Sequence, residues 1–230
     1  MVSVSHFWQM LGSRRFVREA VLALVVGLLS AIAYLGYGFY ADYREQKAHK
    51  AFAEGVELFE QALTAHNAKE PESKQKMRWQ EAEASFKIGY KQFSSARLAP
   101  FFLAFQSEAA LRLGQVEQAL ALLDAMLSSL GKSSPFYGPY AVKRALIQLD
   151  QPSKELQGRG LESLKQLAHD ASLPSQDMAL YHLGEYYSSQ NNPALAQEAW
   201  KKLREIGKHM TPAMPSPWAD AVIHRLDVQA

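Results

Sequence analysis

One stretch near the start of the chain, AVLALVVGLLSAIAYLGYGFY (Ala20 to Tyr40), contains no charged side chain, and three arginines lie just before it. As an α-helix it would be about 31 Å long at 1.5 Å per residue, close to the thickness of the hydrocarbon core of a bilayer. The pattern therefore predicts a short basic tail over residues 1–19 and a single transmembrane helix over residues 20–41.

A cleaved signal peptide is the alternative interpretation of this stretch, with Ala31-Ile32-Ala33 as its small-residue cleavage site. The apolar run continues past that site into an aromatic cluster that ends at Tyr40, as is typical of a membrane–water interface. An uncleaved anchor is therefore favoured over a signal peptide. Ala23, Gly27 and Ala31 recur every four residues, a spacing that permits close helix contact in lipid, although alanine and glycine are common in such helices.

Residues 42–230 show the pattern of a helical domain. Apolar residues recur at spacings of three and four in blocks rich in Ala, Leu, Glu and Gln, whereas alternating Val/Ile/Thr runs are missing. Proline- and glycine-containing breaks separate these blocks, for example at Pro71, at Pro152 and at Asn191-Asn192-Pro193. The sequence therefore predicts an all-α fold.

A tetratricopeptide-type spacing is present between residues 177 and 209. Two leucines, a glycine and an aromatic residue are followed by an alanine and then by a tryptophan. In a tetratricopeptide repeat, the small glycine and alanine let two antiparallel helices approach closely, and the large aromatic residues fill the space between them. A second match lies at about 100–131, and weaker ones surround Ala82 with Phe86 and Gly160 with Leu164. The residues that carry the two better matches are Leu113, Gly114, Ala119, Leu180, Leu183, Gly184, Tyr187, Ala196 and Trp200.

These repeats predict a right-handed α-solenoid of about four degenerate helix pairs, closed by a capping helix at about 217–229. In such a solenoid the first helix of each pair lines a concave groove. The inward positions would be Phe101, Ala104, Glu108, Met178, Tyr181, Glu185 and Ser188. The alternative to a groove position is burial in the core, and it applies to two of the three residues Phe101, Phe102 and Phe105. A groove of mixed aromatic and acidic character favours apolar or basic polypeptide segments and disfavours an anionic tail.

Charge and chemistry exclude several classes of function. The chain has 25 Lys+Arg and 23 Asp+Glu, and beyond the first 19 residues the two signs balance, which is atypical of nucleic-acid binding. Cysteine is absent, no His-Glu-x-x-His spacing occurs, and no glycine cluster has the form of a phosphate loop. His182 and Glu185, one helical turn apart, are more typical of a surface pair than of a metal site. The sequence predicts no enzyme activity, metal, cofactor or small-molecule substrate.

The layout resembles the single-pass, membrane-anchored tetratricopeptide proteins typified by the bacterial ancillary subunit of the Sec translocon. The resemblance rests on the basic tail and anchor, on Ala51, Gly55 and Leu58, on the segment 93–99 that leads into Leu113-Gly114, and on the closing Pro217-Trp218-Ala219. It implies a protein of the bacterial inner membrane whose domain faces the periplasm and lacks an active site.

The same resemblance implies a membrane-tethered module that binds polypeptide partners, namely a translocon subunit, a chaperone or an envelope protein. The alternative function is that of a permanent structural scaffold subunit in a secretion or envelope-assembly complex. The oligomeric state is left open.

Overall fold

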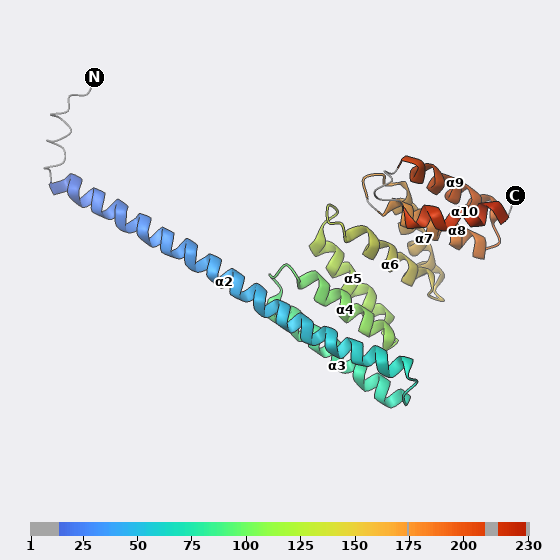
Figure 1. Ribbon diagram of the computed structural model, residues 1–230, viewed down its shortest axis with the longest axis horizontal. Coiled ribbons are helices and arrows are strands. Elements are labelled where there is room, and N and C mark those ends of the chain that lie inside the picture. Colours follow the sequence, from blue (N-terminus) through green and yellow to red (C-terminus); the bar gives the residue numbers. More distant parts are fainter. Residues whose placement is uncertain (1–13, 174, 210–215, 229–230) are drawn as a thin grey trace, which may run out of the picture. The chain divides into compact units, whose positions relative to one another are not determined.

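The computed structural model describes residues 14–173, 175–209 and 216–228, and all regular secondary structure in these ranges is helical. Side chains are not described for residues 14–24, 31–33, 35, 209 and 223–228. The all-α expectation is confirmed for the described residues. The helices are α2 (Arg14–Asn67), α3 (Glu72–Phe93), α4 (Ala99–Arg112), α5 (Val116–Leu130), α6 (Tyr137–Leu149), α7 (Lys154–His169), α8 (Gln176–Ser189), α9 (Pro193–His209) and α10 (Pro217–Val228) (Figure 1).

The transmembrane helix predicted over residues 20–41 is wrong. Among the residues that the structure describes, no helix is long and apolar enough to cross a membrane. The described part of this stretch belongs to α2, which runs on past it through charged residues such as Asp42 and Arg44 to Asn67. Gly27 has no neighbouring atom within 4 Å of a built Cβ, whereas the side chains of Ala23 and Ala31, the other members of the predicted contact face, lie outside the described residues.

Two compact units divide the chain, residues 1–51 and residues 52–230. In the described part of the first unit, the cation of Arg44 lies 5.9 Å from the ring centre of Tyr40, and that of Lys47 lies 5.4 Å from Tyr43. The second unit holds the last turns of α2 and every later helix, and it contains both pockets discussed below.

Helix ends in the second unit follow local sequence signals. Gly114 has a φ of +75° in the turn between α4 and α5, a backbone conformation that glycine adopts without strain. The Ser153 hydroxyl accepts a hydrogen bond from the Leu156 N–H at the start of α7. Asn192 caps α9 in the same way, with Pro193 as the first helical residue. These signals cut the unit into short helices joined by tight turns.

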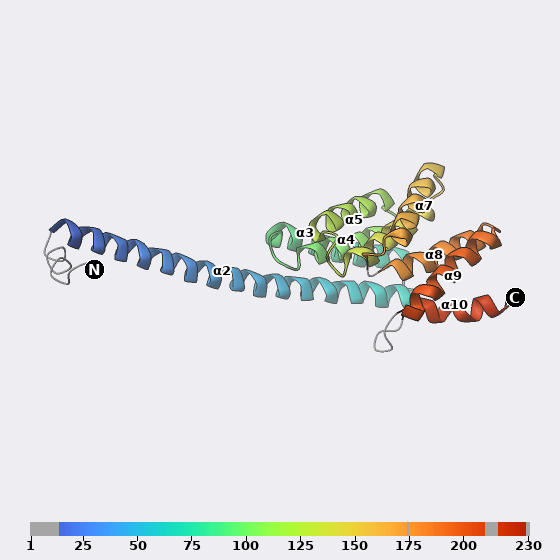
Figure 2. The same cartoon turned by 90° about the horizontal axis from the view of Figure 1, so that it is seen from above.

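The helices of the second unit pack as successive pairs (Figures 1 and 2). The end of α2 packs on α3, and α4 packs on α5, α6 on α7 and α8 on α9, while α10 covers α8 and α9. Consecutive pairs also touch, because α3 packs on α4, α5 on α6 and α7 on α8. We call α2, α4, α6 and α8 the first helices of the four pairs.

Two apolar regions hold these pairs together. Five phenylalanine rings from α2, α3 and α4 form a cluster in which each ring centre lies within 6.4 Å of at least two others, mostly in edge-on contacts: Phe52, Phe59, Phe86, Phe102 and Phe105. From α6 onward, a continuous core runs through to α10 around the fully buried Trp200, Leu164 and Val142. Burial of these side chains supplies the main driving force that stacks the pairs.

The residues of the repeat spacing lie at the contacts between helices. A methyl group at Gly184 would overlap the indole of Trp200, so α8 and α9 approach closely at this point. Ala196 is likewise buried, at 1% exposure. In the pair α4–α5 the corresponding close position is Ser107, whose hydroxyl donates a 2.9 Å hydrogen bond to the carbonyl of Ala119. Gly114 instead serves the turn.

Candidate functional site

A pocket of about 280 Å³ opens across three of the first helices. The end of α2, most of α4 and the first half of α6 contribute its walls. We call it the first-helix pocket, and it is lined by Phe59, Leu63, Ala104, Phe105, Glu108, Arg112, Tyr140 and Lys143. The floor is mainly aromatic and aliphatic, and the charged side chains come from α4 and α6.

Glu108 lies between two cations in this pocket. One of its carboxylate oxygens accepts a 2.5 Å hydrogen bond from Lys143 Nζ, and the other accepts a 3.2 Å bond from Arg112 Nε. Burial alone would raise the pKa of Glu108, but the bonds and charges of Lys143 and Arg112 outweigh it and hold the pKa below its ordinary value. With one carboxylate against two cations, the charged side of the pocket carries a net charge of about +1.

Two aromatic side chains flank this ion-pair cluster. Burial, and secondly the nearby charge of Glu108, raise the pKa of Tyr140, so its hydroxyl stays protonated and can donate a hydrogen bond. The guanidinium of Arg112 lies 5.8 Å from the ring centre of Trp79 in α3. The pocket thus combines apolar walls with polar groups held in place, an arrangement suited to an apolar group of a ligand.

Of the seven groove residues predicted from the sequence, only two line the first-helix pocket. Ala104 and Glu108 line the first-helix pocket, whereas Phe101 packs edge-on against Phe136, with 5.0 Å between ring centres. Of the three phenylalanines in α4, Phe102 is fully buried in the core, while Phe101 and Phe105 are half-buried.

The predicted groove residues of α8, which are Met178, Tyr181, Glu185 and Ser188, do not line this pocket and are half-buried. Tyr181 packs against Trp218 of α10, with 5.0 Å between ring centres, and the ring of His182 lies 5.3 Å from the same tryptophan. Burial lowers the pKa of His182. The capping helix therefore contacts Tyr181, which the sequence analysis placed in the groove.

Sequence reasoning missed the two pocket residues of α6. Lys143 and Glu108 are 35 residues apart in the sequence, and their contact depends on how one pair stacks on the next. A signal was present, because Lys143 lies on a predicted helix three residues after Tyr140, the spacing that places two side chains on one helix face.

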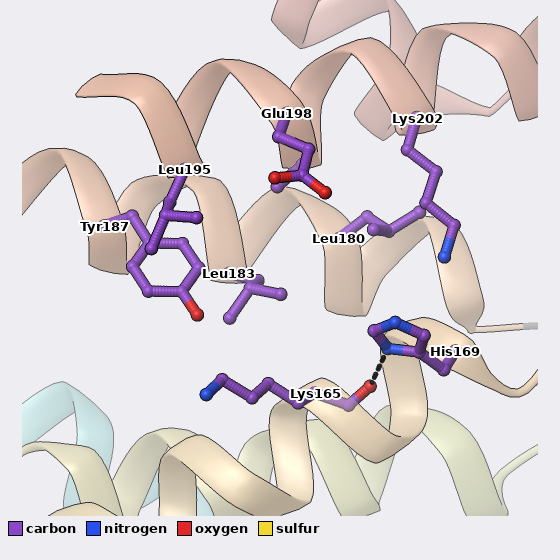
Figure 3. Close-up of a pocket in the computed structure, with 9 residues that line it drawn as sticks. Lys165, His169, Leu180, Leu183, Tyr187, Leu195, Glu198 and Lys202 are labelled. Carbon is purple, nitrogen blue, oxygen red and sulfur yellow. Dashed lines mark hydrogen bonds between the residues drawn. The ribbon is translucent and has the colours of Figure 1, made fainter. Parts of the chain in front are cut away.

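A second cavity, of about 140 Å³, lies between α7, α8 and α9 (Figure 3). We call it the α7–α9 cavity. Leu180, Leu183 and Ala199 form apolar walls that are nearly buried, at 2%, 6% and 6% exposure. The remaining lining residues, which surround these walls, are Lys165, His169, Tyr187, Leu195, Glu198 and Lys202. This cavity shares no helix with the first-helix pocket.

Metal-ligating side chains do not gather anywhere in the described residues: no group of three or more His, Asp or Glu side chains could hold a metal ion. His182 and Glu185, the one pair that sequence spacing suggested, belong to no such group in these ranges.

Comparison with known proteins identifies no family. No protein-family model matches the chain. No curated protein is significantly similar to it. Function is therefore argued from the pockets themselves.

Proposed function

We propose that this protein is a non-enzymatic interaction module, a tetratricopeptide-like helical repeat that binds a polypeptide segment in its first-helix pocket. The observation that carries the proposal is the pocket itself, a 280 Å³ opening across α2, α4 and α6 with an aromatic floor. Repeat proteins bind extended partners on surfaces of this kind, which several successive repeats build together.

The charges of the pocket change the kind of ligand that is expected from the sequence. Glu108 is held by Lys143 and Arg112, whose side chains are 36% and 41% exposed and so remain accessible. A partner segment would place an apolar or aromatic side chain against Phe105 and Tyr140, where burial of apolar area supplies most of the affinity. The paired carboxylate would not select for a basic segment.

Partner identity is proposed from the family resemblance alone. It names a translocon subunit, a chaperone or an envelope protein as the bound polypeptide. These classes differ in the adducts that a cross-linking experiment would recover, so one experiment addresses both the pocket and its partner.

A photo-cross-linking amino acid at Tyr140 tests the proposal, with the same group at Tyr186 as a matched control. Tyr186 is a half-buried tyrosine of α8 outside the first-helix pocket. We expect a polypeptide adduct at Tyr140 that Lys143→Glu removes and that Lys154→Glu, an exposed change at the start of α7, retains. Equal adducts at both tyrosines, or none at Tyr140, would contradict the proposed pocket.

A permanent scaffold role is the second candidate, favoured by two exposed apolar side chains on α3. Met77 and Ile88 are 49% and 56% exposed. Eleven residues apart on one helix, they lie about three turns apart on the same face, where one partner could cover both. A scaffold subunit would co-purify with its complex at a fixed ratio even when Lys143 is changed, whereas a groove-bound partner would be lost.

A further inference from the structure

The α7–α9 cavity has the size of a single apolar side chain. Its volume of about 140 Å³ is below the usual range for drug-sized ligands. A dry cavity of about 150 Å³ is large enough for a benzene ring. Leu183 forms part of the wall and Leu195 lies at the mouth, where it is 38% exposed. The cavity therefore fits a phenyl or isobutyl group.

The rim of this cavity is positively charged. Lys165 approaches from α7 and Lys202 from α9, on either side of the opening, while Glu198 is the one acidic side chain among the lining residues (Figure 3). Within the described part of the chain, neither lysine ammonium forms an ion pair. Two ammonium groups against one carboxylate leave a net charge of about +1 beside an apolar cavity.

His169 adds a polar group to the rim on the side of Lys202 (Figure 3). Its Nδ1 lies 2.8 Å from the carbonyl oxygen of Lys165, and because a carbonyl can only accept, Nδ1 carries the hydrogen. This bond fixes the orientation of the imidazole ring beside Lys202, as Figure 3 shows. The rim is thus partly ordered before any ligand arrives, which reduces the entropy cost of binding.

A ligand with a phenyl or isobutyl group and a carboxylate would complement both the apolar cavity and its positively charged rim. We propose that the α7–α9 cavity binds the C-terminal residue of a polypeptide, with its apolar side chain against Leu183 and Leu195 and its α-carboxylate at Lys165 and Lys202. A C-terminal phenylalanine or leucine places the two groups on one carbon atom, so that they reach the cavity and its rim together. This site is separate from the first-helix pocket, and the inference does not rest on the function proposed above.

The test is a titration of the full chain with N-acetylphenylalanine, followed by the NMR signals of its leucine methyl groups. A ligand of about 15 heavy atoms should bind with a Kd on the order of 1 mM. N-acetylphenylalanine amide, which lacks the carboxylate, should bind about fivefold more weakly or worse, because it loses its contacts with two cations. N-acetyl-Ala-Ala-Phe should bind at least as well as the single residue.

Charge variants locate the site on the rim. Lys202→Glu should weaken binding of the acid by about fivefold, whereas the matched control Lys201→Glu, an exposed neighbour that does not line the cavity, should leave it unchanged. Glu198→Gln should strengthen binding, because it removes the one negative charge of the rim. Neither Lys202 nor Glu198 is buried, so both variants should fold, and circular dichroism checks this.

Three results would overturn the proposal. Equal binding of acid and amide would show that the carboxylate is not recognised. Binding of the single acid but not of the peptide would assign the cavity to a free small acid. Failure of all three probes to shift the methyl signals at about 10 mM, a tenfold excess over the expected Kd, would leave the cavity without this ligand.

Discussion

The close approach of α8 and α9 at Gly184 yields a prediction with a definite sign. A methyl group at this position would overlap two indole atoms of Trp200 and lie 2.6 Å from a third, Cε2. Trp200 is fully buried, so its ring has no free space to move into. Gly184→Ala should therefore strain the contact, although alanine is by itself the better helix former.

The magnitude follows from two opposing effects. Overpacking of a closed core costs about 1–3 kcal/mol, and the overlap with Trp200 Nε1 places this change in the upper part of that range, at about 2–3 kcal/mol. Exchange of glycine for alanine inside a helix gains about 1 kcal/mol. We expect Gly184→Ala to lower the free energy of unfolding by about 1–2 kcal/mol, which for a unit of this size lowers Tm by roughly 2–8 °C.

Gly158→Ala is the matched control. Gly158 also lies within a helix, α7, but it is exposed and no atom lies within 4 Å of a built Cβ. Only the gain in helix propensity remains there, so this variant should be about 0.5–1 kcal/mol more stable than the wild type. Both variants are compared by thermal and urea unfolding of the full chain, followed by circular dichroism at the helix band. If Gly184→Ala raised stability as much as Gly158→Ala, the close contact at Trp200 would be refuted.

Two further predictions concern polar contacts of the second unit. The folded-state pKa of Glu108 is held below its ordinary value of 4.5. The bonds of the charged carboxylate therefore stabilise the fold fully above that pH, and this stabilisation is lost as the pH falls through the lowered pKa. The stability difference between wild type and Glu108→Gln, about 1 kcal/mol at neutral pH, should therefore close in urea titrations below about pH 4.5; a difference that stays constant down to about pH 3 would contradict it. Ser216→Ala removes a 2.6 Å bond to the buried Asp177 and the cap on the Ala219 N–H, and should destabilise α10 by about 1–2 kcal/mol. Hydrogen exchange should speed up in α10 before α4, and equal protection of α10 in both proteins would argue against this role.

Local patterns predicted the helices and their ends well. The run Asn191-Asn192-Pro193 separates α8 from α9, as its turn and capping residues indicate. The spacing that ends in Trp200 marks a true close contact, because a helix pair needs a small residue opposite a large one wherever its axes approach. Such features depend on neighbours within one pair of helices, and a single sequence contains them.

Other features differ from the sequence-based expectations, either because a local signal was misread or because a later helix supplies the contact. The sequence pattern assigned Gly114 to the repeat signature, but Ser107 occupies the close position and bonds to Ala119 instead. Tyr181 was expected in the groove, and its contact with Trp218, which comes from a later helix, was not foreseen. The predicted anchor was bounded at residue 41, but no proline or glycine follows Tyr40 until Gly55, and α2 runs without a break to Asn67.

The two pockets differ in the helices that build them, and this separation makes their tests independent. The first-helix pocket uses α2, α4 and α6, whereas the α7–α9 cavity uses α7, α8 and α9. One close link between the two sets is at Gly160 of α7, where a methyl group would lie 2.7 Å from the carbonyl oxygen of Ala145 in α6. Substitutions at separate sites without shared partners have additive effects. Lys143→Glu should therefore leave carboxylate binding unchanged, and Lys202→Glu should leave the Tyr140 adduct in place, so a loss in either assay reports on one pocket alone.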